Sequence, residues 1–458
     1  MEAVGPTAEQ LARLTAALEE QEETPMKTVK LTVKTVLIAA ALYVAMAVTV
    51  LAVSPGLREA LGELLSGFEP YVQTVDGTTA VADGIEIKVV SAMSDPNTAR
   101  IYYEVRDLKG NRVDDKSIIT VEAYIPEKGE EKWDTISFSG GSSLHYDPES
   151  KAALMDTQVH WERNRTENAT MHLDLSDLIT STEWLRVPFP EDVKLTDRKL
   201  DSETLKDGRV VLKPNQTFRE LEHGHYALSS FGFGSDDRLH FLWQINDPDF
   251  NLEESFIRCG VWSKSEMLYQ DSRGKEGAPC EKDYYDAPDP VLFRKDGILY
   301  YDDVYNAGVE DMEDIWWGDI QGSYCTGVRI EGPWSIDVPL VNAPVREIDM
   351  NGHKLYNGAV TEKLSLSPLS ATLTSSLPDP GRWASIMFDM ALYLKDGTVI
   401  PDQWGRGNFS KDPDRASNYW LFDEPIVPED VVGVAIGQWY IPIEGDTAQP
   451  GRWLPEMP

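Results

Sequence analysis

The chain follows two different hydrophobic periods. Near the N-terminus, Leu11, Leu14 and Leu18 recur at the spacing of one helical face. From about residue 72 the period falls to two, and around Ile85 apolar residues alternate with Glu86 and Lys88. Turn residues such as Lys109-Gly110 then separate one alternating stretch from the next. These patterns predict a mainly β protein preceded by short helical elements.

An uncharged apolar run, residues 35–53, separates the two parts. Its 19 residues contain no Gly or Pro and span roughly 28 Å as a helix, close to the thickness of a bilayer's hydrocarbon core. Three lysines precede the run, Lys27, Lys30 and Lys34, and Arg58 follows it. This excess of positive charge favours a cytoplasmic N-terminus. The alternative is a cleavable export signal, but such apolar regions are usually shorter and begin nearer the N-terminus.

Six segments follow from these changes of pattern. We expect a cytoplasmic amphipathic helix with a basic flank (1–34), a transmembrane helix (35–53), a juxtamembrane helix capped by Ser54 (54–70), and about three β-sandwich-like extracellular domains (71–200, 201–346 and 347–458). The division rests on repeats. A Gly-containing turn recurs in DLKGNRVDD, FRKDGILYYDD and LYLKDGTVIPD. A strand with Trp and a Val/Ile-Pro pair recurs in TEWLRVPFPED, GPWSIDVPLVN and GQWYIPIEGD, and we interpret it as the last strand of each domain.

Charge and cysteine content narrow the class of protein. The formal net charge is −35, and such a surface repels nucleic acid, so no nucleic-acid partner is expected. The three cysteines, Cys259, Cys280 and Cys325, form no CxxC pair or Cys/His cluster. Either one disulfide, with Cys259–Cys280 the closer pair in sequence, or three thiols fits this count.

The candidate chemistry lies in DDVYNAGVEDMEDIWWGDI, where acidic residues surround two adjacent tryptophans. Carboxylates beside aromatic rings are what glycan binding or glycoside hydrolysis requires, which makes Trp316, Trp317, Asp314 and Asp319 the ligand candidates. The interpretation we favour is a solvated acidic loop with a tryptophan anchored in the core, because charge runs usually face water. No enzymatic activity is expected.

Motifs for metals and cofactors are incomplete. His223-Gly224-His225 offers two imidazoles without a third ligand nearby in the sequence. NDPDFNLEE begins like a calcium loop, but Leu252 replaces the glycine at its sixth position and Arg258 replaces the glutamate at its twelfth. Neither a metal nor a cofactor is expected.

The region from the apolar run to about residue 115 resembles the domain-of-unknown-function 4179 family. The resemblance is carried by Ser54-Pro55-x-x-Arg58-Glu59, by Gly67-Phe68-x-Pro70-Tyr71, and by the hairpin DGIEIKVVSAMSDPNTARIYYEVRD. It implies a single-pass, anti-sigma-factor-like membrane protein of Gram-positive bacteria, with no established catalytic residues. The 34 residues before the apolar run are shorter than the cytoplasmic domain of many anti-sigma factors and lack His and Cys.

These observations lead to a functional expectation with two alternatives. We expect an envelope sensor or regulator in the cell membrane, with the N-terminus cytoplasmic, the bulk extracellular, and Leu11, Leu14 and Leu18 contacting a partner such as a sigma factor. The first alternative is a surface binding or structural protein that recognises cell-wall glycan or peptide without signalling. The second is an extracellular glycan hydrolase that uses the acidic tryptophan cluster.

Overall fold

The computed structural model describes residues 53–454 apart from 74, 76–77, 126–136, 162–164, 166–167, 248, 252, 265–288, 356–357, 377–388, 402–405 and 410–414. This part of the chain is mainly β, as predicted. No helix within it is long and apolar enough to cross a membrane. The predicted N-terminal helix, the lysines that follow it and residues 35–52 of the predicted span lie outside the described residues.

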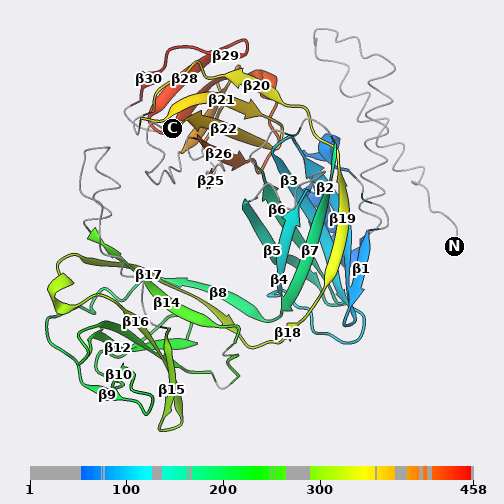
Figure 1. Ribbon diagram of the computed structural model, residues 1–458. Helices are drawn as coiled ribbons and strands as arrows, with labels where there is room; N and C mark the ends of the chain where they lie inside the picture. The colour runs from blue at the N-terminus through cyan, green and yellow to red at the C-terminus, as the bar shows by residue number, and fades with distance from the viewer. Residues whose placement is uncertain are drawn as a thin grey trace, which may run out of the picture. The chain divides into compact units, whose positions relative to one another are not determined.

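The first sandwich has two layers that share one core (Figure 1). One layer contains β1 (Thr79–Ala82), β2 (Ile85–Ser94), β3 (Thr98–Asp107), β6 (Ala152–His160) and β5 (Ser137–Asp147), in that spatial order. The other contains β4 (Ile118–Tyr124) and β7 (Ala169–Ile179), with β18 (Arg329–Ile330) and β19 (Trp334–Leu340) both paired to β7. A pairing between β4 and β5 makes the two layers one continuous sheet.

Strand β19 shows why this core closes as it does. Trp334, Ile336 and Val338 are buried and alternate with polar or exposed positions, as a strand covering one face of a core requires. They pair with Leu175, Leu173 and Met171 of β7, in the order given. The Trp334 indole also donates a 3.1 Å hydrogen bond to the Ile85 carbonyl oxygen of β2. β19 therefore completes the first core, although it follows β7 by more than 150 residues.

The second sandwich is built from the residues between β7 and β18. Its larger sheet has the order β11 (Arg219–Glu220), β12 (Tyr226–Phe233), β13 (Leu239–Ile245), β16 (Ile298–Tyr305) and β15 (Val291–Lys295). Its smaller sheet has the order β14 (Phe256–Ser263), β17 (Ile315–Cys325) and β8 (Thr182–Val187). A separate hairpin joins β9 (Ser202–Thr204) to β10 (Val210–Leu212), and the short helix η4 (Val309–Asp311) lies between β16 and β17. Both sheets bury aromatic and aliphatic side chains in a common core.

The order of strands differs from the predicted succession of three consecutive domains. TEWLRV forms β8, which pairs with β17 and belongs to the second sandwich instead of ending the first. WSIDVPL forms β19, which belongs to the first sandwich instead of ending the second. The second sandwich is thus an insertion between two neighbouring strands of the first. Figure 1 shows the chain passing from the end of β7 into β8 and returning to the first sandwich along β18, which pairs with β7.

The third sandwich follows β19 without interruption. Its strands are β20 (Arg346–Asp349), β21 (Val360–Leu366), β22 (Ser370–Ser376), β23 (Met390–Leu394), β24 (Val399–Ile400), β25 (Arg406–Phe409), β26 (Arg415–Leu421), β27 (Val431–Ile436), β28 (Trp439–Glu444), β29 (Thr447–Ala448) and β30 (Arg452–Trp453), with η5 (Pro428–Asp430) before β27. They form one 11-stranded sheet around a single core. WYIPIE, the third copy of the tryptophan strand, is β28.

The segment after the predicted membrane span is docked on the first sandwich. It contains η2 (Pro55–Leu57), α3 (Arg58–Leu64) and η3 (Glu69–Tyr71) in place of one continuous helix. Leu57, Leu61 and Leu65 form an apolar face that is buried against Tyr102 and Leu154. Ser54 holds the N-cap position of η2, as expected, but its hydroxyl makes no capping bond and donates instead to the buried Glu104 carboxylate. Arg58, the predicted outer flank of the membrane, begins α3 and donates to the Val53 carbonyl oxygen at 3.2 Å.

Candidate ligand-binding site on the inserted sandwich

The predicted tryptophan cluster lies on β17, and its two tryptophans point to opposite sides of the sheet. Trp317 packs into the second core, with ring centroids 5.8 Å from Phe189 and 5.2 Å from Phe231. Trp316 is 39% exposed. One tryptophan is thus anchored in the core, as predicted, and the other faces solvent.

The acidic residues of the cluster have different surroundings. Asp314 accepts a 2.7 Å hydrogen bond from the Ser263 hydroxyl, and Asp319 forms an ion pair with Arg186 at 2.9 Å. Each of these two carboxylates is therefore held by a different neighbour. Asp302 and Asp303 are buried in strand β16, so the interpretation of the whole run as a solvated loop was wrong for them.

Trp316 belongs to a larger group that we call the aromatic face, made of Trp184, Phe256, Trp262 and Trp316. All four project from the outer side of the β14–β17–β8 sheet, whose inner side carries buried residues such as Leu185 and Ile257. Trp184 is 63% exposed and Phe256 36% exposed. Among the described residues, Trp184 is the most exposed large hydrophobic side chain. Sequence reasoning identified Trp316 and missed the other three, which come from two other strands.

The rings form two pairs at opposite ends of the sheet. Trp184 and Phe256 meet edge to face with centroids 5.9 Å apart, and both flank Ser323 of β17. Trp262 and Trp316 are direct cross-strand neighbours with centroids 4.9 Å apart. Six residue steps along β14 separate Phe256 from Trp262, a span of roughly 20 Å.

Two glycines allow the Trp262 ring to lie along the sheet. A Cβ atom on Gly260 would collide with this ring, and one on Gly318 would lie 2.9 Å from it. Both glycines sit where the pairing of β14 with β17 shifts register. Because the indole occupies the space above the two glycines, the ring is held close to the backbone of both strands.

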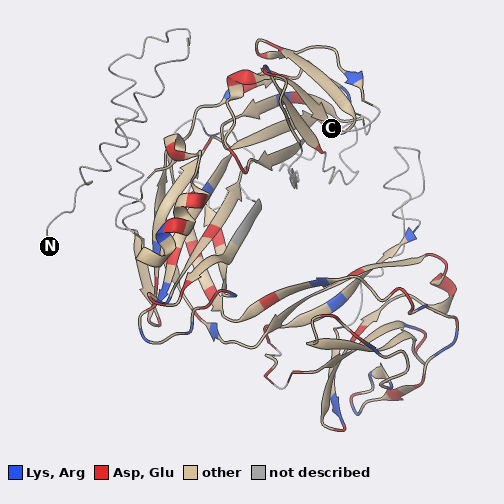
Figure 2. Cartoon of the chain, turned by 180° about the vertical axis from the view of Figure 1, so that it is seen from behind, with Lys and Arg blue, Asp and Glu red and all other residues tan. Residues whose placement is uncertain are grey.

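A polar row crosses the sheet between the two ring pairs. Arg258 of β14, Gln321 of β17 and Arg186 of β8 are consecutive cross-strand neighbours, and all three are exposed. Asp319 adds a carboxylate through its ion pair with Arg186. Acidic residues prevail over the described chain as a whole (Figure 2), whereas this row contains two guanidinium groups and one carboxylate.

A buried Asp–His–Asp chain lies in the other sheet of the same sandwich. His240 is fully buried, with Nδ1 3.0 Å from Asp302 Oδ2 and Nε2 3.1 Å from Asp236 Oδ1. Burial lowers the pKa of His240, but the hydrogen bonds and charges of Asp236 and Asp302 outweigh burial and raise that pKa to about 9. The imidazolium therefore bridges two carboxylates inside the fold. We infer that these Asp–His–Asp hydrogen bonds stabilise the second sandwich.

The cysteines and the His-Gly-His segment were the other candidates from the sequence. Cys259 and Cys325 are buried free thiols, and Cys280 lies outside the described residues. The His223-Gly224-His225 segment is a turn in which the His225 ring stacks on Tyr324 at 3.6 Å. No cluster of potential metal ligands occurs among the described residues.

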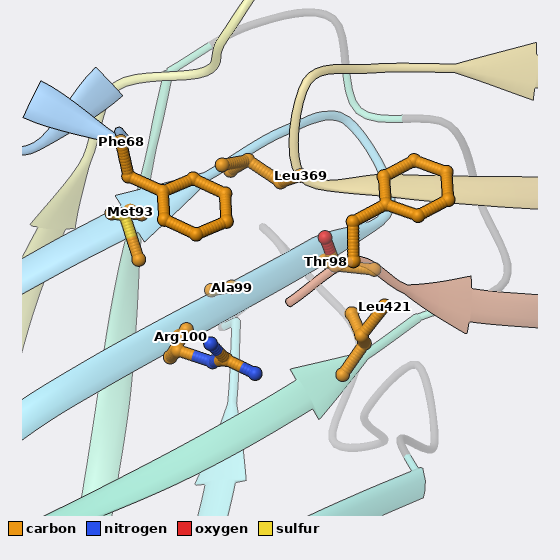
Figure 3. A pocket seen from close by; sticks show the side chains of 8 residues that line it. Phe68, Met93, Thr98, Ala99, Arg100, Leu369 and Leu421 are labelled. Carbon is orange, nitrogen blue, oxygen red and sulfur yellow. The ribbon is translucent and has the colours of Figure 1, made fainter. Parts of the chain in front are cut away.

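One cavity, shown in Figure 3, lies between the first and third sandwiches. Its walls include Phe68, Met93 and Arg100 together with Leu369 and Leu421. Its volume is about 20 Å³, which holds about one water molecule. A cavity of this size is a packing defect at a contact surface and not a ligand site.

The contact around this cavity contains hydrogen bonds and a stacked pair of rings. The hydroxyls of Ser367 and Ser370 both donate to the buried Asp95 carboxylate, at 2.5 and 2.7 Å. The buried His160 ring stacks on Tyr419 with centroids 3.8 Å apart. Burial lowers the pKa of His160 to about 3, so this ring is neutral at physiological pH. These contacts join the first and third sandwiches.

Comparisons with known proteins leave the family open. No protein family pattern matches the chain, and no curated protein matches it. Among solved structures, a conserved domain protein from Bacillus anthracis is similar over 83% of this chain and 82% of its own, with 11% identity and a TM-score of 0.37. A marsupial T cell receptor has a TM-score of 0.15, with 9% identity over 77% of this chain and 96% of its own. Domains 1–6 of the surface layer protein SbsC have a TM-score of 0.11, with 10% identity over 98% of this chain and 67% of their own.

Proposed function

We propose that this chain is a membrane-anchored envelope protein whose extracellular β sandwiches bind an envelope ligand on the aromatic face. The observation that carries the proposal is the exposure of Trp184 and Trp316 on one side of a sheet whose other side is fully packed. Fully burying a large apolar side chain contributes about 1.5–3 kcal/mol, and the exposed parts of these two rings forgo a share of it. Aromatic residues grouped on a surface in this way are typical of recognition sites.

The binding proposal predicts a result for envelope co-sedimentation. Replacing both Trp184 and Trp316 with alanine is expected to remove most binding of the detergent-solubilised full chain to cell envelopes from which the membrane has been extracted, because each ring loses its stacking surface. The matched control is Trp453→Ala, which removes a 47% exposed tryptophan from the third sandwich. Equal envelope binding by the double variant and the control would contradict the proposal.

A second candidate function is the sensor or regulator expected from the sequence. It is supported by the lysines before the apolar run and by the docking of residues 53–72 on the first sandwich. That docking ties the outer end of the predicted span directly to the extracellular fold. In this proposal, ligand binding outside changes how residues 1–34 contact a cytoplasmic partner, with a sigma factor as the partner that the family resemblance implies.

This regulatory proposal predicts that the full chain retains a sigma factor in a pull-down from its host. Replacing Leu11, Leu14 and Leu18 with alanine is expected to abolish retention, because these residues form the apolar stripe of the predicted helix. Replacing Glu9 and Glu20 with glutamine is the matched control, because these residues lie on the side of the predicted helix opposite the leucine stripe. If the unmodified chain captures no sigma factor, the regulatory proposal is wrong while the binding proposal stands.

A further inference from the structure

We infer that the aromatic face binds an extended, uncharged glycan chain, with its sugar rings stacked on the two aromatic pairs and its hydroxyl groups bonded to the polar row. This inference deepens the proposed binding function and rests on it. Pyranose rings present apolar C–H faces bounded by hydroxyl groups. A site for them therefore needs flat aromatic surfaces next to groups that donate and accept hydrogen bonds.

The aromatic face offers this combination along one direction. The Trp184–Phe256 pair and the Trp262–Trp316 pair lie at its two ends. Between them, Arg258 and Gln321 provide donors, and Gln321 and Asp319 provide acceptors. Since roughly 20 Å of strand separates the two aromatic pairs, a ligand that contacts both must be extended and must carry polar groups in its middle.

The size of the face favours a narrow ligand over a folded protein. Three strands about 4.8 Å apart and about seven residues long give a sheet area on the order of 300 Å². A stable protein interface buries about 800 Å² on each partner. The described face alone is therefore too small for a stable protein complex but matches a single polymer chain laid along the strands.

Charge decides between neutral and anionic glycans. Arg186 is already paired with Asp319, which leaves Arg258 as the other base of the polar row. The chain as a whole has a net charge of −35, and this field raises the free energy of bringing a polyanion to the surface. An uncharged chain avoids that repulsion and still receives hydrogen bonds from both guanidinium groups.

The test measures binding of the purified full chain to uncharged β-1,4-linked hexamers of glucose and of N-acetylglucosamine, by calorimetry and tryptophan fluorescence. We expect one of these probes to bind with little dependence on salt. Trp184→Ala and Trp316→Ala should each weaken binding roughly two- to tenfold, and Trp453→Ala should leave it unchanged. Circular dichroism of each variant verifies that the fold is retained.

Several outcomes overturn the inference, and they separate it from the proposed function. If neither hexamer binds or competes, while envelope binding still depends on Trp184 and Trp316, the ligand is not an uncharged glycan and the proposed function survives. Competition by a cell-wall peptide alone leads to the same conclusion. Hexamer binding that is unaffected by both tryptophan substitutions places the sugar elsewhere. If envelopes themselves do not bind, the proposed function and this inference fail together.

Discussion

Replacing Trp334 with alanine is expected to destabilise the first sandwich by about 4 kcal/mol. The side chain is fully buried, and removing a buried tryptophan or phenylalanine side chain costs about 3–5 kcal/mol through lost transfer energy and the cavity that remains. The substitution also leaves the Ile85 carbonyl oxygen without its indole donor. The loss is measured by urea unfolding of the full chain, with Trp334→Phe expected to recover part of it.

Hydrogen exchange shows which sandwich depends on Trp334. In the structure this residue completes the core between β2 and β7, so amide protection should fall in those strands. Protection of β12 and β13 in the inserted sandwich should stay unchanged. If β13 and β17 lose protection while β7 keeps it, residues 334–340 belong with the second sandwich. That result would agree with the sequence-based prediction of three consecutive domains.

The second large effect is expected from His240 and depends on pH. Its folded-state pKa of about 9 lies above the ordinary histidine value of about 6.5. The resulting stability is therefore fully present below pH about 6.5 and is lost as the pH rises through about 9. A shift of this size corresponds to roughly 3 kcal/mol. The difference in unfolding free energy between the natural chain and His240→Gln should shrink by about that amount between these two pH values.

A matched control for this experiment is His160→Gln, because His160 is also buried but stacks on Tyr419 and its pKa is lowered by burial to about 3. Since this ring is neutral in the folded and the unfolded chain above pH about 6.5, the difference in unfolding free energy between the natural chain and this variant should stay constant up to pH 9. A pH-independent difference for His240→Gln would mean that the buried imidazole is neutral and that the Asp–His–Asp chain is not held by charge.

Local patterns predicted the strands well but not their partners. Period-two alternation located β2 and β3, and the recurring tryptophan pattern located β19, because a local pattern reports only that one side of a strand is buried. It carries no information about which core buries that side. The pairing of β19 with β7 spans the whole inserted sandwich, so an interpretation that assumes consecutive domains assigns GPWSIDVPLVN to the wrong core.

Only part of the candidate site was predicted, because a local pattern does not show which distant strands lie side by side. Trp316 was found because acidic residues surround it in the sequence, whereas Trp184 lies more than 130 residues earlier on another strand. A usable signal existed in FIRCGVWS, where Phe256 and Trp262 fall on the side opposite Ile257, Cys259 and Val261. A strand whose buried side is already apolar does not need large rings on its other side, and that excess identifies a surface for recognition.

The insertion of the second sandwich has a mechanical consequence. The chain enters it after Ile179 and returns at Arg329, and these two residues pair directly, while the Thr180 amide donates to the Val328 carbonyl oxygen at 3.1 Å. Tension applied between the two ends of the protein therefore passes from β7 to β19 through their shared hydrogen bonds. The inserted sandwich remains outside the path of the load until that pairing breaks, so its aromatic face keeps its shape while the rest of the chain is pulled.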